Sequence, residues 1–179
     1  MGSVPTNLGY LQDLRFLDLS YNKLGKDLDF LTSLRNCSKM NTLAFVVNRF
    51  EGVLPSSIGN LSTQFTGLYL GGNKISGTIP IALQNLINLI ILGMEDTLLT
   101  GMIPTSFEKF QKMQGLRLWG NKLSGKIPSS IGNLTQLAEL FLSENNLEGS
   151  IPPSIGTCQS LQKLDVLENY LGAFSLALS

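Results

Sequence analysis

Apolar residues recur along this chain with a fixed spacing. Between residues 121 and 151 one set of positions returns after 24 residues, so that Asn121, Leu123, Gly125 and Ile127 are followed by Asn145, Leu147, Gly149 and Ile151. A period of this length is typical of a solenoid, in which each repeat buries its apolar side only against its neighbours. The pattern therefore predicts a stack of similar coils.

One polar position keeps the phase of the repeat along the chain. It recurs at intervals of 26, 25, 24, 24, 24 and 24 residues, at Asn22, Asn48, Asn73, Thr97, Asn121, Asn145 and Asn169. Apolar residues stand three and five positions before each of these, as Leu118 and Leu116 do before Asn121. This spacing of two predicts a short strand with alternate side chains facing inward.

The recurrent asparagine is expected to be buried where the chain turns off the strand. A buried carboxamide without partners costs about 1 to 3 kcal/mol. The side chain is therefore predicted to bond backbone groups of its own turn and of the next repeat, which builds a structural ladder along the stack. Thr97 offers one hydroxyl instead of a carboxamide, so a local weak point is expected there.

The second half of the repeat contains glycine and then Ile-Pro or Leu-Pro, as in Gly77-Thr78-Ile79-Pro80. Glycine permits a positive φ or a close backbone approach, and proline fixes an extended start to the return segment. Segments such as Ile58-Gly59-Asn60-Leu61 then supply apolar residues for the convex wall. The predicted fold class is an α/β repeat solenoid with a parallel β-sheet on the concave face and short 3₁₀ or turn segments on the convex face.

Residues 1–172 are predicted to form a single solenoid, with a half repeat over 1–10 and then about seven repeats of 24–26 residues. Residues 173–179 break the pattern and are interpreted as an irregular apolar tail. Neither end has the polar character of a cap, so end-to-end self-association is expected. The chain is interpreted as part of a longer solenoid, without a signal peptide or membrane span of its own.

The two cysteines share one phase of the repeat, five repeats apart. At a strand spacing of about 4.8 Å, Cys37 and Cys158 would lie roughly 24 Å from each other, which is too far for a disulfide. Both are predicted to be buried apolar residues. Extra residues before Cys37 lengthen the second repeat, and a wider turn is expected there.

Composition excludes several function classes. The chain has no histidine, which removes Ser/His, Cys/His and His-metal arrangements, and it has neither a glycine-rich phosphate loop nor a kinase signature. No catalytic residue, metal or cofactor is predicted. A formal net charge of zero without a Lys/Arg block argues against nucleic acid and against membrane contact by this segment.

The repeat L-x-x-L-x-L-x-x-N-x-L-x-G-x-I-P-x-x-I-G-N-L resembles the plant-specific leucine-rich repeats of receptor-like kinase and receptor-like protein ectodomains. Residues 27–37 and 54–62 resemble segments of the immune-receptor branch of that kinase family. The resemblance implies a non-catalytic module on the extracellular side of the plasma membrane, used in pathogen or peptide-signal perception. It also implies a peptide or protein ligand, a co-receptor ectodomain as a partner, and a cytoplasmic Ser/Thr kinase domain that this chain lacks.

Two alternatives remain open at this point. One is a secreted leucine-rich-repeat inhibitor of a microbial wall-degrading enzyme, and the other is an intracellular leucine-rich-repeat scaffold. Sequons at Asn36, Asn60 and Asn133 bear on the choice, because such sites are usable in a secreted protein. Asn85 occupies the same phase without a sequon, so repeat chemistry alone also explains these asparagines.

Outward-facing strand positions are the candidates for ligand binding, because the core does not dictate their identity. Aromatic and arginine side chains are enriched in binding hot spots. Gly71 and Gly93 are expected to leave hollows between them. The predicted ligand-binding residues on the concave face are Tyr69, Glu95, Arg117, Trp119 and Phe141.

Overall fold

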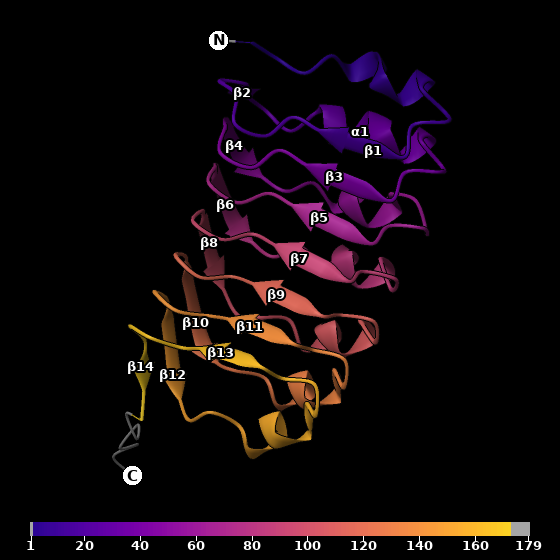
Figure 1. Ribbon diagram of the computed structural model, residues 1–179. Coiled ribbons are helices and arrows are strands. Elements are labelled where there is room, and N and C mark those ends of the chain that lie inside the picture. The colour runs from indigo at the N-terminus through magenta and orange to yellow at the C-terminus, as the bar shows by residue number, and fades with distance from the viewer. Residues whose placement is uncertain (1, 173–179) are drawn as a thin grey trace.

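The computed structural model describes residues 2–172, which form an elongated stack of coils (Figure 1). A regular coil passes through a strand of one sheet, a strand of a second sheet and a short 3₁₀ helix before the next coil begins. The predicted solenoid, with its concave parallel sheet and its convex 3₁₀ segments, is confirmed.

The first sheet contains seven parallel strands in sequence order within the described residues. The register is in step from coil to coil, since Leu43 pairs with Leu17 on one side and with Leu68 on the other. Leu43 and Leu68 are fully buried between the sheet and the convex wall. The strands are β1 (Phe16–Asp18), β3 (Thr42–Ala44), β5 (Gly67–Tyr69), β7 (Ile91–Gly93), β9 (Gly115–Arg117), β11 (Glu139–Phe141) and β13 (Lys163–Asp165).

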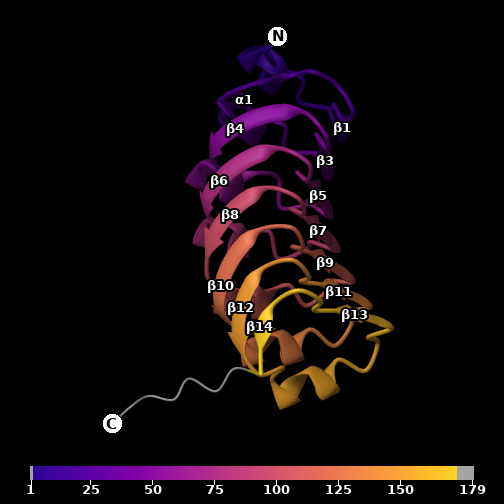
Figure 2. The same ribbon diagram turned by 90° about the vertical axis from the view of Figure 1, so that its left-hand side faces the viewer.

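A second parallel sheet flanks the first along one side of the stack (Figure 2). This second sheet was not predicted from the repeat pattern. Its strands carry few inward apolar residues, such as Leu99 on β8 and Leu123 on β10, and glycine follows two residues later in each. The strands are β2 (Gly25–Lys26), β4 (Arg49–Val53), β6 (Lys74–Thr78), β8 (Leu98–Gly101), β10 (Lys122–Lys126), β12 (Asn146–Gly149) and β14 (Tyr170–Leu171).

Short 3₁₀ helices form the convex wall. Six of them follow directly after a proline whose backbone is extended, as Pro128 precedes η6. Each closes a turn that points one or two apolar side chains inward, as Ile131 does. The 3₁₀ helices are η1 (Thr6–Tyr10), η2 (Leu34–Asn36), η3 (Ser56–Asn60), η4 (Ile81–Asn85), η5 (Thr105–Lys109), η6 (Ser129–Asn133) and η7 (Pro153–Thr157).

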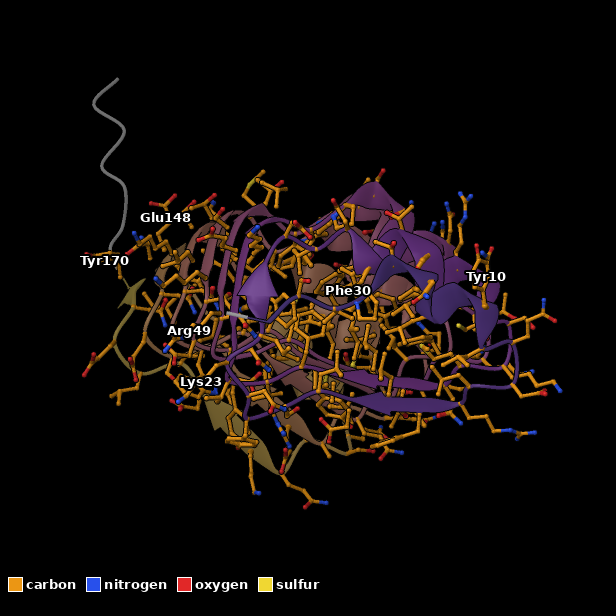
Figure 3. The ribbon with its side chains drawn as sticks, turned by 90° about the horizontal axis from the view of Figure 1, so that it is seen from above. Tyr10, Lys23, Phe30, Arg49, Glu148 and Tyr170 are labelled. Atoms are coloured by element: carbon orange, nitrogen blue, oxygen red, sulfur yellow. The ribbon has the colours of Figure 1, made fainter. Side chains whose placement is uncertain are left out.

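The extra residues of the second repeat form a one-turn helix, α1 (Phe30–Ser33), directly before η2. Phe30 lies inside the coil when the stack is viewed along its axis (Figure 3). Its ring packs 5.6 Å from the ring of Phe45 and 5.4 Å from that of Phe50. The wider turn expected here is therefore filled by an aromatic cluster.

The asparagine side chains join neighbouring coils. The Nδ2 of Asn121 donates to the carbonyl oxygens of Met94 at 2.8 Å and of Leu118 at 3.1 Å, and its Oδ1 accepts the N–H of Leu99 at 2.9 Å. Equivalent bonds are made by Asn48, Asn73, Asn145 and Asn169.

The predicted direction of these bonds is wrong, because Met94 and Leu99 belong to the preceding repeat and not to the next one. The reason lies in the preceding coil. Met94 follows the end of β7, and Leu99 lies in β8 just before its pairing with β10 begins. On the side of the following coil their carbonyl and N–H therefore lack strand partners, and the carboxamide of that coil supplies both. Asn22 is exposed, and within the described part of the chain its side chain bonds only its own turn, at Leu19 and Ser20.

Thr97 breaks this pattern. Its hydroxyl lies 2.6 Å from Oδ1 of Asn121 in the following repeat and 3.2 Å from the carbonyl oxygen of Met94. Within the described residues, no hydrogen bond joins the Thr97 side chain to Leu70 or Ile75, the equivalents of the groups that an asparagine would bond. The ladder of carboxamide bonds is therefore interrupted between the coil of Asn73 and the coil of Thr97, where the weak point was expected.

Both cysteines are free and buried, as the sequence predicts. Burial raises the pKa of the Cys37 and Cys158 thiols. Their sulfurs contact backbone carbonyl oxygens of Leu8 and Ile131. The apolar tail predicted at 173–179 lies outside the described residues.

Candidate functional site on the concave face

The first sheet presents three rows of side chains to the concave face, with one residue from each coil in each row. The predicted ligand-binding residues belong to two of these rows, one with Tyr69, Arg117 and Phe141 and the other with Glu95 and Trp119. The third lies one position before the buried leucine and was missed, although the alternation of the strand extended back by one step predicts it. This third row is Phe16, Thr42, Gly67, Ile91, Gly115, Glu139 and Lys163.

An open hollow of about 650 Å³ lies on this face, between β1 and β9. Its lining includes side chains from all three rows and from the turn after β1. The lining residues are Phe16, Asp18, Ser20, Tyr21, Thr42, Ala44, Val46, Tyr69, Glu95 and Arg117.

The predicted ligand-binding residues divide into two groups. Tyr69, Glu95 and Arg117 line the hollow, whereas Trp119 and Phe141 do not. Trp119 and Phe141 are half-buried, just after β9 and at the end of β11.

The most exposed aromatic side chains of the hollow were not predicted. Phe16 is 59% exposed and Tyr21 is 79% exposed. Phe16 is the first residue of β1, and Tyr21 belongs to the turn after it. The alternation that defines the third row would have predicted Phe16 as an outward-facing residue. The repeat pattern contains nothing that distinguishes Tyr21.

Tyr69 lies along the sheet, close to the start of its own strand. A Cβ atom placed on Gly67 would be 2.8 Å from Cε2 of the Tyr69 ring. The missing side chain at Gly67 thus gives the ring its place on β5, and larger residues there would push it outward.

Hollows expected at Gly71 and Gly93 are not empty, and that prediction is wrong. A Cβ atom on Gly71 would lie 2.7 Å from Cδ of Glu95, and a Cβ atom on Gly93 would lie 2.8 Å from Oε2 of Glu95. The long Glu95 side chain has folded into the space that the two glycines leave. Its Oε2 is buried and has no hydrogen-bond partner among the residues that the structure describes.

Charges at the edge of the hollow form a small network. Nη2 of Arg117 lies 3.0 Å from Oε2 of Glu139, and Nζ of Lys163 lies 2.8 Å from Oε1 of the same carboxylate. The hydrogen bonds from Lys163 and then Arg117 lower the pKa of Glu139. At the opposite edge, hydrogen bonds from Ser20 lower the pKa of Asp18. Both carboxylates are therefore ionised at neutral pH.

This arrangement is suited to binding by shape, charge and aromatic contact. Among the described residues, no group of three or more His, Cys, Asp or Glu side chains is placed to hold a metal ion. None of the helices in that part of the chain has the length and apolar character to cross a membrane.

The asparagines of the three sequons are exposed and accessible. Each is the last residue of a 3₁₀ helix, Asn36 of η2, Asn60 of η3 and Asn133 of η6. Asn133 also donates from Nδ2 to Glu108 at 3.2 Å. Glycosylation at these positions stays a prediction.

Known proteins share this repeat. The family model described as Leucine Rich Repeat matches residues 13–37, 64–86, 112–134 and 136–158. The LRR receptor-like serine/threonine-protein kinase EFR of Arabidopsis thaliana is 43% identical over 89 residues. That match covers 48% of this chain but 9% of EFR, so this chain spans a small part of that relative's length.

Solved receptor structures contain the same architecture over most of this chain. The crystal structure of PEPR1-AtPEP1 is 34% identical, with a TM-score of 0.89 over 95% of this chain and 24% of that one. The Arabidopsis receptor kinase HAESA, in complex with the peptide hormone IDA and the co-receptor SERK1, is 27% identical with a TM-score of 0.78. That match covers 95% of this chain and 33% of the HAESA chain.

Proposed function

The chain belongs to the leucine-rich repeat family, and from that premise we propose that it is a non-catalytic recognition module that binds a peptide or protein ligand on its concave sheet. The hollow between β1 and β9 carries this proposal, because its exposed aromatic residues have no role in the core. Aromatic side chains that line a depression are the type that anchors ligands.

The likeness to receptor ectodomains supports a more specific proposal. We propose that the module is part of a plant cell-surface receptor kinase ectodomain that perceives a pathogen or peptide signal. The kinase would lie outside this segment, because the matched part is 9% of EFR.

The proposed partners are a peptide ligand and a co-receptor ectodomain. HAESA is solved with a peptide hormone and the co-receptor SERK1, which supports this assignment by analogy. An extracellular location agrees with the accessibility of Asn36, Asn60 and Asn133 to glycosylation.

The concave assignment can be tested with the chain as it is. Peptides would be selected from a random display library on the purified protein, and their affinities then measured on Phe16→Ala and Tyr69→Ala variants. We expect each substitution to weaken binding by about 2 kcal/mol, or about thirtyfold. Melting temperatures should change little, because neither side chain belongs to the buried core.

Ile81→Ala is the matched control, since Ile81 is a large apolar side chain that is 67% exposed at the start of the convex helix η4. It should change neither affinity nor melting temperature. Peptides that bind both concave variants normally and lose affinity for Ile81→Ala would place recognition on the convex side.

A further inference from the structure

Glu95 is an unusual member of the hollow because its carboxylate has no partner. Oε2 is buried, and within the described residues no hydrogen bond or ion pair involves the Glu95 side chain. An unpaired buried acceptor costs about 1 to 3 kcal/mol, and more when it is charged. Such a cost in a native structure calls for an explanation, and a ligand-binding role is one.

The neighbouring cation does not neutralise Glu95. Arg117 lines the same hollow, but its Nη2 bonds Glu139 at 3.0 Å. Glu139 in turn holds Lys163. The Arg117 guanidinium is thus paired with Glu139 at the edge of the hollow, and among the described residues no cation pairs with the Glu95 carboxylate.

The remaining surroundings favour a cation with an apolar stem. Asp18 adds a second carboxylate to the lining, and Phe16, Tyr21 and Tyr69 add aromatic rings. Rings attract cations through their electron-rich faces. A carboxylate beside aromatic side chains therefore has the chemistry that recognises a guanidinium or an ammonium group.

Glu95 is free to turn toward such a cation. Gly71 and Gly93 hold it only by contact, so rotation of the carboxylate into the hollow breaks no hydrogen bond. The absence of side chains at the two glycines thus leaves the space in which the Glu95 side chain packs. The cost of the buried, unpaired oxygen would be relieved when a ligand donates to it.

We propose that the hollow binds an extended peptide through one arginine side chain, whose guanidinium pairs with Glu95 while its neighbours in the peptide pack on Tyr69 and Phe16. This inference rests on the proposed function and adds the chemical class of the ligand. Arginine fits better than lysine, because its planar group donates two parallel bonds to a carboxylate and stacks on aromatic rings. A volume of about 650 Å³ also leaves room for the residues beside it.

The test uses the same display library on the unmodified protein and on Glu95→Gln, followed by deep sequencing of the bound peptides. Arginine should be enriched at one position on the unmodified protein, and this enrichment should disappear on Glu95→Gln. A selected peptide should then bind about tenfold or more tightly than its citrulline analogue, which has the same shape without the charge. On Glu95→Gln the two peptides should bind alike.

Glu148→Gln is the matched control, because Glu148 is an exposed carboxylate on β12 of the second sheet, away from the first sheet (Figure 3). It removes the same charge and should leave the arginine preference intact. Peptides that lose affinity for Tyr69→Ala but show no arginine preference would overturn this inference and leave the proposed function standing. A library that yields no binder to the unmodified protein would overturn both.

Discussion

A single asparagine side chain satisfies backbone groups of two coils at once. Asn121 donates to Met94 and Leu118 and accepts from Leu99, and it is buried. Asn121→Ala removes every one of these bonds and leaves the N–H of Leu99 without its acceptor inside the stack. The carbonyl oxygens of Met94 and Leu118 keep one donor each, from the side chains of Thr97 and Asn145. We expect the free energy of unfolding to fall by about 1 to 3 kcal/mol, measured by chemical denaturation.

Thr97→Asn is the complementary change. An asparagine here would offer an acceptor for the N–H of Ile75 and a donor for the carbonyl of Leu70, as Asn73 does for Phe50 and Phe45. We expect a gain of about 1 kcal/mol, reduced by the loss of the bond from Thr97 to Asn121. If Asn121→Ala and Thr97→Asn both leave stability unchanged, the asparagine bonds do not hold the coils together.

At this scale the sequence predicted the position of the ladder but not its direction. Periodicity shows that a polar side chain recurs at the end of each strand. It does not show whether the backbone groups without partners belong to the coil before or the coil after. That depends on where each strand leaves the sheet, which is a property of two coils together.

At the scale of elements, the 3₁₀ helices stack so closely that glycine is required between some of them. A Cβ atom on Gly132 in η6 would lie 2.3 Å from the backbone oxygen of Ser154 in η7. Gly156 has the same place in η7, and a Cβ atom there would have no neighbour within 4 Å among the described residues. Substitutions at these two positions therefore distinguish the need for close backbone approach from the conformational freedom that glycine gives the unfolded chain.

We expect Gly132→Ala to destabilise the protein by several kcal/mol, because η6 and η7 would have to move apart. Gly156→Ala should be neutral or slightly stabilising, since it reduces the freedom of the unfolded chain. Thermal unfolding of both variants would check this. Equal melting temperatures would mean that the helices can shift without cost.

The two sheets show why some elements were predicted and others were missed. Strands of the first sheet alternate Leu-x-Leu, which is a clear signal of period two. Strands of the second sheet combine one buried residue, such as Leu123, with a glycine of positive φ such as Gly125. A glycine in a strand weakens the signal, because it resembles a turn.

The candidate site belongs to the scale of the whole molecule. Its three rows follow from periodicity, but the hollow depends on which side chains point away from the sheet and which lie along it. Glu95 fills the space at Gly71 and Gly93, whereas Phe16 and Tyr21, which line the same hollow, are exposed. Side-chain direction across several coils is not encoded in any one repeat, so the hollow could not be predicted from the sequence.

The ends of the stack carry the last prediction. Leu164 on β13 is 41% exposed, whereas its equivalents Leu116 and Leu140 on β9 and β11 are fully buried. Within residues 2–172 no further strand pairs with the outer edge of β13, and an exposed leucine beside such an edge favours pairing with another stack. We therefore expect concentration-dependent self-association of this chain, measured by sedimentation equilibrium.

Leu164→Glu should weaken that association by about tenfold or more, because a charge would be buried in the contact. Leu98→Glu is the matched control, since Leu98 is 42% exposed but lies on β8 in the middle of the second sheet. It should leave association unchanged. Of the two leucines, only Leu164 lies on the last described strand of the first sheet. A strictly monomeric protein, or equal effects of the two substitutions, would therefore show that the end of that sheet is not the contact.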